Sequence, residues 1–292
     1  MPNGILVIDK PADWTSMDVC AKVRGLLGEK RVGHGGTLDP MATGVLPVFV
    51  GRATRAVPFV MDSKKEYIAG LKLGVVTDTQ DITGTILEQR AVKDMHQEVL
   101  RVLERFRGEI LQVPPMYSAV KVKGKKLYEL ARRGEEVERA PRLVTIYSLE
   151  LLEMESPCDF VLRICCSKGT YVRTLCHDMG QALGCGGVLS SLRRTMAGGY
   201  TQRETISLET LVQAAQRGEA EKLLLPVDSC FSHCPAVSIG GRALFKARNG
   251  NPFPWQGEEG TYRVYDPEGN FLLLGRCESG EMKTIKSFFE VS

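Results

Sequence analysis

Apolar and polar residues along the chain follow two periods, one that predicts strands and one that predicts helices. In residues 66–76 apolar side chains recur at every second position, which is the period of a strand. In residues 94–107 they recur every three or four positions, which is the period of an amphipathic helix. The predicted strands cover residues 4–8, 45–50, 66–76, 84–88, 142–153, 159–166 and 187–196, and the predicted helices cover 16–27, 53–62, 94–107, 172–183 and 207–215.

Two of these elements contain residues that restrict them. Pro47 lies inside 45–50 and has no N–H to donate, so we expect this strand to be irregular or at an edge of the sheet. Ser16 stands where the first helix begins and is its expected N-cap. Strands and helices alternate irregularly, and some strands follow each other directly. This order favours an α+β fold with a mixed, mainly antiparallel sheet and flanking helices.

The pattern changes at residues 226–235, beyond which helical periodicity is weak. Two apolar runs around the polar turn 266–270 are a strong hairpin signal. We therefore expect two domains. The first covers residues 1–230, and the second is a small β-rich domain at 231–292, near the lower size limit for independent stability.

Composition places the chain among ordinary globular proteins. Of its 292 residues, 43% are hydrophobic and 25% are charged, which allows a substantial core. The net charge of +3 is too small to indicate a partner unless the positive residues cluster. The first apolar run stops at Asp9, too early for a signal peptide, and no 18-residue apolar stretch follows. We expect a cytoplasmic protein with no membrane partner.

Nine cysteines are scattered along the chain, mostly among apolar residues, which suggests reduced and buried thiols. Cys230, His233 and Cys234 are close enough in sequence to be considered as metal ligands. A structural zinc site needs four ligands, however, and no second pair of ligands lies at the usual spacing. We therefore expect no metal here.

Positive charge is concentrated at residues 121–142. This segment holds eight lysines and arginines against four glutamates, together with Tyr128. It can be a solvated insertion, or an arm that binds the phosphates of a nucleic acid, because basic residues that displace counterions supply most of the sequence-independent affinity. The lysine pair 64–65 and the arginine pair 193–194 would add to such a surface if the fold brings them together.

Residues 31–44, RVGHGGTLDPMATG, have no regular hydrophobic period and place Asp39 before Pro40. Their spacing excludes a P-loop and a dinucleotide fingerprint. Cys176 and His177 are neighbours in a predicted helix, where adjacent side chains diverge, so they do not suggest a nucleophile and its base. Pro40 restricts the backbone of Asp39, and the glycines allow another chain to approach closely. Two interpretations stay open: a glycine-rich turn with a capping aspartate, or a site built on this carboxylate.

The stretch VGHGGTLDPMATGVLP at residues 32–47 resembles the catalytic motif of the TruB-type pseudouridine synthases, which isomerise uridine 55 in the T-loop of tRNA. Further motifs follow in the family's order: DKP at 9–11 with WTS at 14–16, KEY at 65–67, TDT at 77–79 with Asp81 and Gly84, KGTYVR at 168–173, and SLRR at 191–194. The resemblance covers residues 4–230 and implies the pseudouridine synthase fold. Beyond it, the chain is similar to the family's PUA-like domain in size and β character.

The resemblance implies that Asp39 is the essential nucleophile and that Arg173 pairs with it. The reaction breaks the C1′–N1 bond of uridine, turns the base and rejoins it at C5, so no cofactor and no metal are expected. The carboxylate can add to C1′ as in retaining glycosidases, promote elimination to a glycal, or add to C6 of the base. In each route it must stay ionised in a closed pocket, which a guanidinium partner favours.

The resemblance implies contacts to the substrate for four further residues. Tyr67 would stack on the target base and assist proton transfer, and Tyr171 and Leu192 would line the pocket. His34 would fill the space that the uridine leaves in the RNA stack. Because the target base lies inside a folded RNA loop, the enzyme must flip it and offset the unstacking by stacking and phosphate contacts. The basic segment 121–142 is the expected arm for this grip.

Two alternatives stay open. One is a guide-RNA-dependent synthase of the dyskerin type, which would bring partner proteins and lack the basic insertion at 121–142. The other is a non-catalytic tRNA-folding or RNA-binding protein on the same scaffold, against which an intact Asp39, Tyr67 and Arg173 argues. The expected partner is the T-arm of tRNA, bound by a monomer that requires no protein partner.

Overall fold

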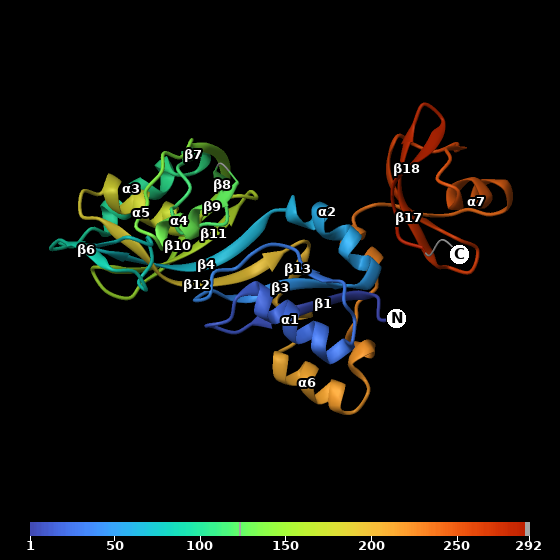
Figure 1. The fold of residues 1–292 in the computed structure, drawn as a ribbon. Coiled ribbons are helices and arrows are strands. Elements are labelled where there is room, and N and C mark those ends of the chain that lie inside the picture. Colours follow the sequence, from blue (N-terminus) through green and yellow to red (C-terminus); the bar gives the residue numbers. More distant parts are fainter. Residues whose placement is uncertain (123, 290–292) are drawn as a thin grey trace.

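Within the residues that the computed structural model describes, 1–122 and 124–289, a nine-stranded sheet forms the centre of the molecule (Figure 1). Its order is β1 (Gly4–Lys10), β3 (Thr43–Val50), β12 (Gly187–Ala197), β4 (Lys65–Leu73), β11 (Asp159–Cys166), β10 (Arg142–Met154) and β7 (Gly108–Gln112), with β2 (Val32–His34) on β3 and β13 (Tyr200–Thr201) on β12. β3 and β12 are parallel, and the other neighbouring pairs are antiparallel. The predicted mixed, mainly antiparallel sheet is confirmed.

Helices pack against this sheet and build the larger of its apolar clusters. These helices are α1 (Ser16–Leu27), α3 (His96–Arg105), α5 (Val172–Ala182) and α6 (Leu208–Gln216). Successive residues of β1 alternate between two clusters: Leu6 and Ile8 belong to the larger one, and Ile5 and Val7 to a second one. A strand that is covered on both faces needs apolar side chains on both, which explains the unbroken run at 5–8.

β3 is an inner strand, so the expectation of an edge or irregular strand is wrong. It pairs with β1 on one side, and with β2 and then β12 on the other. The carbonyl of Pro47 accepts a hydrogen bond from Gly35, just beyond His34, the last paired residue of β2. The N–H and C=O of a strand residue face the same neighbouring strand. The N–H that Pro47 lacks would therefore point toward the β2 side, at a position where β2 has already ended and needs no donor.

The first helix is capped by Thr15, so the expectation of Ser16 as N-cap is wrong. Thr15 Oγ1 accepts a hydrogen bond from the Asp18 N–H at 3.1 Å, and the Asp18 carboxylate accepts one from the Thr15 N–H at 2.9 Å. This is a complete capping box. Ser16 is buried instead, and its Oγ accepts a hydrogen bond from the Leu38 N–H at 2.9 Å.

Two of the predicted elements are each divided in the structure. The helix expected at 53–62 is a 3-10 helix, η1 (Gly51–Ala56), followed by α2 (Val57–Met61). The strand expected at 66–76 is β4 followed by the short β5 (Val75–Thr77), which pairs with β6 (Ile86–Gln89). In the described part of the chain, no helix has the length and apolar character needed to cross a membrane.

A five-stranded sheet near the C-terminus forms the predicted β-rich unit, beside α2 in Figure 1. Its order is β14 (Ala236–Ser238), β16 (Gly260–Tyr265), β17 (Phe271–Glu278), β18 (Glu281–Ser287) and β15 (Phe253–Pro254), accompanied by α7 (Gly241–Arg248). The expected hairpin is formed by β16 and β17. Phe288 packs on Phe231, with ring centroids 5.8 Å apart, so the unit rests on the preceding segment. The division of the chain after residue 230 stays a prediction.

Candidate active site

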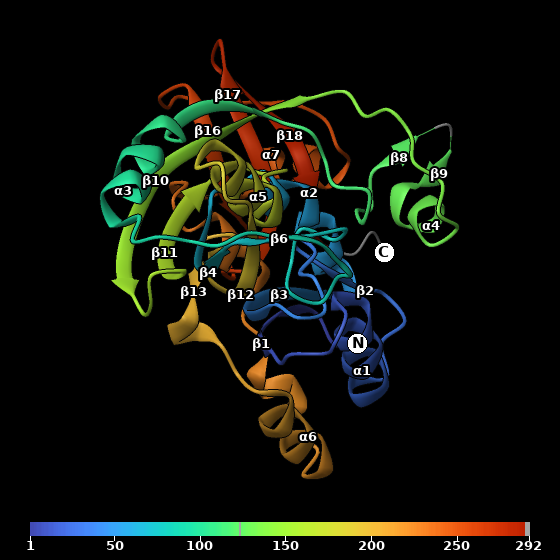
Figure 2. The ribbon, with the colours of Figure 1, turned by 90° about the vertical axis from the view of Figure 1, so that its left-hand side faces the viewer.

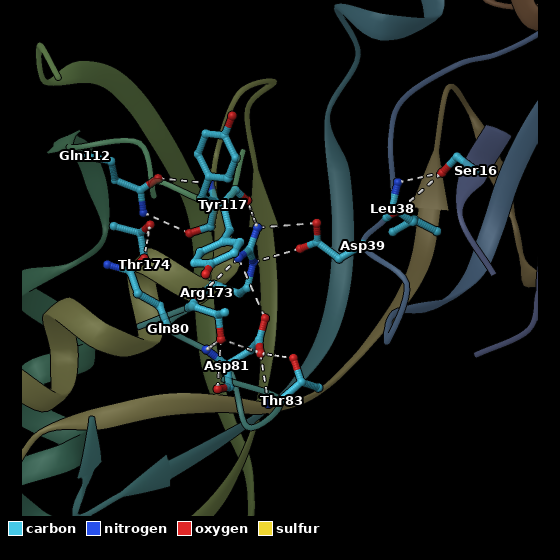
Figure 3. A network of polar contacts seen from close by, with 12 residues as sticks. Ser16, Leu38, Asp39, Gln80, Asp81, Thr83, Gln112, Tyr117, Arg173 and Thr174 are labelled. Carbon is cyan, nitrogen blue, oxygen red and sulfur yellow. Dashed lines mark hydrogen bonds and ion pairs between the residues drawn. The ribbon is translucent and has the colours of Figure 1, made fainter. Parts of the chain in front are cut away.

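Asp39 stands in the loop between β2 and β3, and the residues on both sides of it are held. Ser16 Oγ accepts the Leu38 N–H, and Lys10 Nζ donates to the Pro40 carbonyl at 3.1 Å. Lys10 is fully buried, and burial lowers the pKa of its amine to about 8. With the backbone fixed on either side, the carboxylate of Asp39 points toward Arg173 (Figure 3).

Arg173, in the first turn of α5, meets this carboxylate with two nitrogens. Its Nε lies 2.8 Å from Asp39 Oδ2, and its Nη2 lies 3.4 Å from Asp39 Oδ1. The arginine side chain is 5% exposed and the aspartate side chain 36%. A planar guanidinium that contacts both oxygens fixes the orientation of a carboxylate as well as its position. The structure therefore brings together two residues that are far apart in sequence, with the acidic partner open to solvent.

Arg173 is itself held by groups to which the sequence motifs gave no role. Its Nη1 donates to the Thr79 carbonyl at 2.9 Å, and its Nη2 donates to the Tyr117 carbonyl at 2.8 Å. The buried Asp81 places Oδ2 at 3.7 Å from Nη1, and its Oδ1 accepts a hydrogen bond from Thr83 Oγ1 at 2.6 Å. Two carbonyls and a buried acid thus fix the guanidinium that contacts Asp39 (Figure 3).

Tyr171 precedes α5, and its backbone is held by a buried amide. The Tyr171 N–H donates to Gln112 Oε1 at 3.0 Å, and Gln112 Nε2 donates to the Tyr171 carbonyl at 3.2 Å. Gln112 lies at the end of β7 and is 1% exposed. Its two hydrogen bonds fix the start of the helix that carries Arg173. No sequence motif marked Gln112, because nothing distinguishes it from an exposed glutamine.

Tyr67 and Leu192 lie on the neighbouring strands β4 and β12, and both are buried in the larger apolar cluster. Burial raises the pKa of the Tyr67 phenol, the positive charge of Arg194 opposes this rise, and the Asp39 carboxylate adds to it. Tyr67 lies opposite Arg194 in the register of β4 and β12, and the Arg194 side chain donates to carbonyls of the loop that carries Asp39. Tyr67 is therefore a protonated phenol at neutral pH, close to the site.

His34 ends β2 and is partly buried, five residues before Asp39. Its Nδ1 is buried, and no hydrogen-bond partner for it lies among the described residues. Burial lowers the pKa of His34, and the positive charge of Arg194 lowers it further. The imidazole is therefore neutral at neutral pH, the form in which a ring stacks without carrying charge.

Comparison with known proteins assigns the chain to a family. Residues 24–172 match the family described as TruB family pseudouridylate synthase (N terminal domain), and residues 173–232 match the tRNA pseudouridylate synthase B C-terminal domain. The chain belongs to the TruB family. It is 46% identical to the tRNA pseudouridine synthase B of Syntrophomonas wolfei over 290 residues, 97% of this chain and 96% of that protein. It is also 46% identical to that of Dehalococcoides mccartyi over 294 residues, 99% and 98% of the two chains.

Solved structures share the fold of this TruB-family chain. It is similar to a chain in the crystal structure of a Cbf5-Nop10-Gar1 complex, with a TM-score of 0.75 and 28% identity over 99% of this chain and 85% of that one. It is similar to a chain in an H/ACA RNP bound to a substrate RNA containing 2′-deoxyuridine, with a TM-score of 0.74 and 25% identity over 99% and 86%. The predicted pseudouridine synthase fold is confirmed, and the protein is an isomerase of that class.

Most of the cysteines of this TruB-family chain are buried. Burial raises the pKa of Cys176 to about 12, so it is not a thiolate beside His177 at neutral pH. Cys230 and Cys234 lie in the second apolar cluster, and Cys230 Sγ donates to the Val227 carbonyl. Over the described ranges, no three His, Cys, Asp or Glu residues are grouped as ligands for a metal ion.

The basic segment of the TruB-family chain projects from the body of the molecule (Figure 2). β8 (Lys121–Val122) pairs with β9 (Lys125–Lys126), and α4 (Leu127–Ala131) follows them. Residue 123, counted in the basic segment, lies outside the described residues. Lys126 and Arg132 lie over the ring of Tyr128, at 5.3 and 5.4 Å from its centroid. The exposed basic residues of the segment are Lys121, Lys125, Arg132, Arg133 and Arg142.

The expectation that residues 64–65 and 193–194 extend this basic surface is wrong for one residue of each pair. Lys65 is 8% exposed and Arg194 is fully buried. Lys64 is exposed over the Tyr147 ring, and Arg193 pairs with Asp9 at 2.8 Å. Adjacent residues of a strand point to opposite faces, so a basic pair on a strand places only one charge outward.

A cavity of about 1220 Å³ lies elsewhere, between the C-terminal unit and the segment before it. Its lining includes Pro226, Phe245, Arg248, Tyr265 and Phe288. None of the six residues to which the resemblance gave roles lines this cavity. It is therefore separate from the Asp39 site.

Proposed function

We propose that this chain converts uridine 55 in the T-loop of tRNA to pseudouridine, with Asp39 as the nucleophile and with the target base flipped out of the RNA. The observation that carries the proposal is the pair of Asp39 and Arg173, an open carboxylate oriented by a buried guanidinium. Relatives 40% to 48% identical to the chain are named tRNA pseudouridine synthase B, which supports tRNA as the substrate.

Isomerisation of uridine leaves the composition of the nucleoside unchanged. The C1′–N1 bond breaks, the base turns, a C1′–C5 bond forms, C5 loses its proton and N1 gains one. An ionised Asp39 can serve this sequence by adding to C1′, by promoting elimination to a glycal, or by adding to C6. In each case Arg173 holds the carboxylate at a fixed angle, so that it meets the reacting atom without reorganising. No cofactor takes part in this scheme.

The other residues named from the resemblance receive roles that fit their positions. Tyr67, a protonated phenol opposite Arg194 in the register of β4 and β12, stacks on the uracil and assists proton transfer. Tyr171, at the start of α5, and Leu192, on β12 beside β4, line the pocket for the base. His34 is neutral and enters the RNA stack where the uridine has left.

The exposed basic residues at 121–142 supply the grip on the RNA. Unstacking a base costs a few kcal/mol, which phosphate contacts and stacking in the pocket must offset. The basic segment 121–142 projects from the body of the protein, so it can contact the T-arm of the tRNA while the T-loop enters the Asp39 site. We further propose that the protein acts as a monomer in the cytoplasm, where its nine free thiols stay reduced.

A guide-RNA-dependent synthase is the second candidate, because the structures with the same fold include a Cbf5-Nop10-Gar1 complex and an H/ACA RNP. The two candidates differ in one requirement. A stand-alone enzyme needs only tRNA, whereas a guide-dependent enzyme is inactive without its RNA and partner proteins. The basic segment 121–142 favours the stand-alone enzyme, because it provides its own contacts to phosphates.

Purified protein alone, incubated with unmodified tRNA and followed by mapping of pseudouridine, tests the proposal. Product at position 55 is expected from the wild type and from Asp62→Asn, a control at an exposed carboxylate that pairs with Lys168. Asp39→Asn is expected to bind tRNA with nearly unchanged Kd and to form no product. Product from Asp39→Asn would reject the nucleophile, and tRNA binding by the wild type without product would reject a stand-alone enzyme.

A further inference from the structure

Arg194 is a fully buried arginine on β12. Its Nε donates to the Val45 carbonyl at 2.7 Å, its Nη2 to the Gly36 carbonyl at 3.2 Å, and its Nη1 to the Thr37 carbonyl at 3.5 Å. These three partners are backbone carbonyls, and the Tyr67 phenol forms a further hydrogen bond with the Arg194 side chain. A guanidinium keeps its proton, so burying it without a carboxylate is unfavourable unless its contacts compensate. Such an arrangement calls for a reason.

The three carbonyls lie on both sides of Asp39 in the sequence. Gly36 and Thr37 come shortly before it, and Val45 comes shortly after it. One side chain therefore joins the two ends of the loop 36–45. Gly44 allows the backbones of β3 and β12 to come close here, because its φ is +101° and a Cβ at that position would lie 2.2 Å from the backbone carbonyl oxygen of Arg194.

Arg194 also lies close to two residues with proposed contacts to the RNA, Tyr67 on β4 and His34 at the end of β2. It is opposite Tyr67 in the register of β12 and β4. Its positive charge lowers the pKa of His34 and opposes the rise that burial causes in the pKa of Tyr67. The same charge lowers the pKa of Lys10 and of Lys65, whose amines are buried. For all four groups burial is the larger cause of the shift, and the charge of Arg194 adds to it or opposes it.

We propose that Arg194 is a positioning residue of the synthase: it ties the two ends of the loop 36–45 so that Asp39 meets Arg173, and it holds a fixed positive charge beside His34 and Tyr67. The effect on the reaction rests on the proposed role of Asp39. The tether itself is a property of the free protein, so it is measured without any reaction. Arg194 acts through the loop and does not contact the RNA.

Two substitutions separate the tether from the charge. Arg194→Lys keeps a positive charge, but its donors all sit on one nitrogen and do not reproduce the planar spread of the guanidinium over the Val45, Gly36 and Thr37 carbonyls, and Arg194→Met keeps the apolar stem and loses both properties. Amide hydrogen exchange of residues 36–45 in the free protein is expected to become about tenfold faster, or more, in both variants. Arg163→Met is the control on another strand of the same sheet, because that arginine is exposed and pairs with Glu150, and exchange of the loop is expected to stay as in the wild type.

The charge is followed through the pKa of His34, read by NMR from the ring signals of the four histidines, with His34→Gln to identify its signal. Arg194→Met is expected to raise this pKa toward the ordinary value, whereas Arg194→Lys is expected to leave it nearly unchanged. If Arg194→Met does not fold, Arg194→Gln replaces it, since glutamine is neutral and still donates to one carbonyl. An unchanged His34 pKa in the neutral variant would overturn the electrostatic part of the proposal.

The consequence for the reaction is read from single-turnover rates with enzyme in excess over tRNA. Arg194→Lys is expected to lower the rate by about 30-fold or more while the Kd for tRNA changes less than about threefold. Loop exchange and rate as in the wild type for Arg194→Lys would overturn the tether. Faster loop exchange in the variants, together with a wild type that makes no pseudouridine, would keep the tether and reject the proposed function instead.

Discussion

Arg173 and Asp39 form an ion pair in which one side chain is much more buried than the other. Nε and Oδ2 are 2.8 Å apart, and the arginine side chain is 5% exposed whereas the aspartate side chain is 36% exposed. The guanidinium also donates to two carbonyls, so its position does not depend on the acid. Part of the carboxylate side chain is exposed to solvent, on the side that the guanidinium does not cover. A substrate that approaches from that side meets an acid whose orientation is already set.

Arg173→Lys is expected to lower the single-turnover rate about 30- to 1000-fold. Lysine keeps the charge but contacts one oxygen of Asp39 and leaves the Thr79 and Tyr117 carbonyls with fewer donors. Each charge-assisted hydrogen bond that is lost corresponds to about 1.5–3 kcal/mol. The Kd for tRNA should change less than about threefold, because the arginine lies below the surface.

Arg163→Lys is the control for this substitution. Arg163 pairs with Glu150 at 3.6 Å on the surface, where an ion pair contributes little, and its replacement should leave rate and stability as they are. A rate for Arg173→Lys within about threefold of the wild type would show that the two-point contact does not matter for turnover.

Gln112→Leu is expected to destabilise the protein by about 1–3 kcal/mol, because it leaves the Tyr171 N–H without its partner and removes one of the two donors to the Tyr171 carbonyl, which still accepts from Leu175. Urea unfolding measures this loss. The rate should fall in the folded variant as well, because α5 begins at Tyr171 and carries Arg173. Gln89→Leu, on the exposed strand β6, is the control and should leave both properties unchanged. Equal stability of the two variants would mean that the amide does not hold α5.

Periodicity predicted most of the fold because the larger apolar cluster imposes it on β4 and on α3. The failures share one cause. Pro47 indicated an edge strand because a strand residue without an N–H is expected to lack a neighbour on that side. The sequence alone does not show that β2 stops at His34, which leaves that position of β3 without a need for the N–H. Ser16 indicated a cap because its burial against Leu38, from a distant part of the chain, leaves no local signal. Both errors depended on a contact between segments.

The candidate site shows the same limit. A loop with one acid before a proline pointed to Asp39, but its pairing with Arg173 came from the resemblance, since nothing local connects residues so far apart. The Tyr117 carbonyl was not predicted, because a backbone acceptor has no sequence signature. Gln112 was not predicted either, because in the sequence a buried glutamine looks like an exposed one. Arg194 was taken as one of two surface cations, although strand alternation already implied that one of the pair faces inward.

Replacing Lys121, Lys125 and Arg133 by glutamine is expected to weaken tRNA binding and to reduce its dependence on salt. These residues are exposed on the projecting arm. Three lost phosphate contacts lower the slope of log K against log salt by about two to three. Filter binding between 50 and 300 mM salt, roughly the range in which such slopes are resolved, measures it.

The control for the arm removes the same charge elsewhere. Arg203, Arg217 and Lys222 are exposed near α6, and their replacement by glutamine should leave the slope unchanged. Equal slopes for the two triple variants would assign the effect to net charge and would contradict a specific grip by the arm.

Asp178→Asn is expected to stabilise the protein at pH 8 and to have little effect at pH 4. Burial in α5 raises the pKa of Asp178 from 3.8 to about 6, so between these values the folded state binds more protons than the unfolded state. Stability therefore falls as pH rises from about 4 to 6, and the full penalty is present above that range. Asparagine carries no charge and escapes this penalty. Because the side chain is partly exposed, screening reduces the gain to about 1–2 kcal/mol.

Urea unfolding of the wild type, Asp178→Asn and the exposed control Glu138→Gln at both pH values checks the sign. A gain at pH 4 equal to that at pH 8 would attribute the effect to packing rather than to the buried charge.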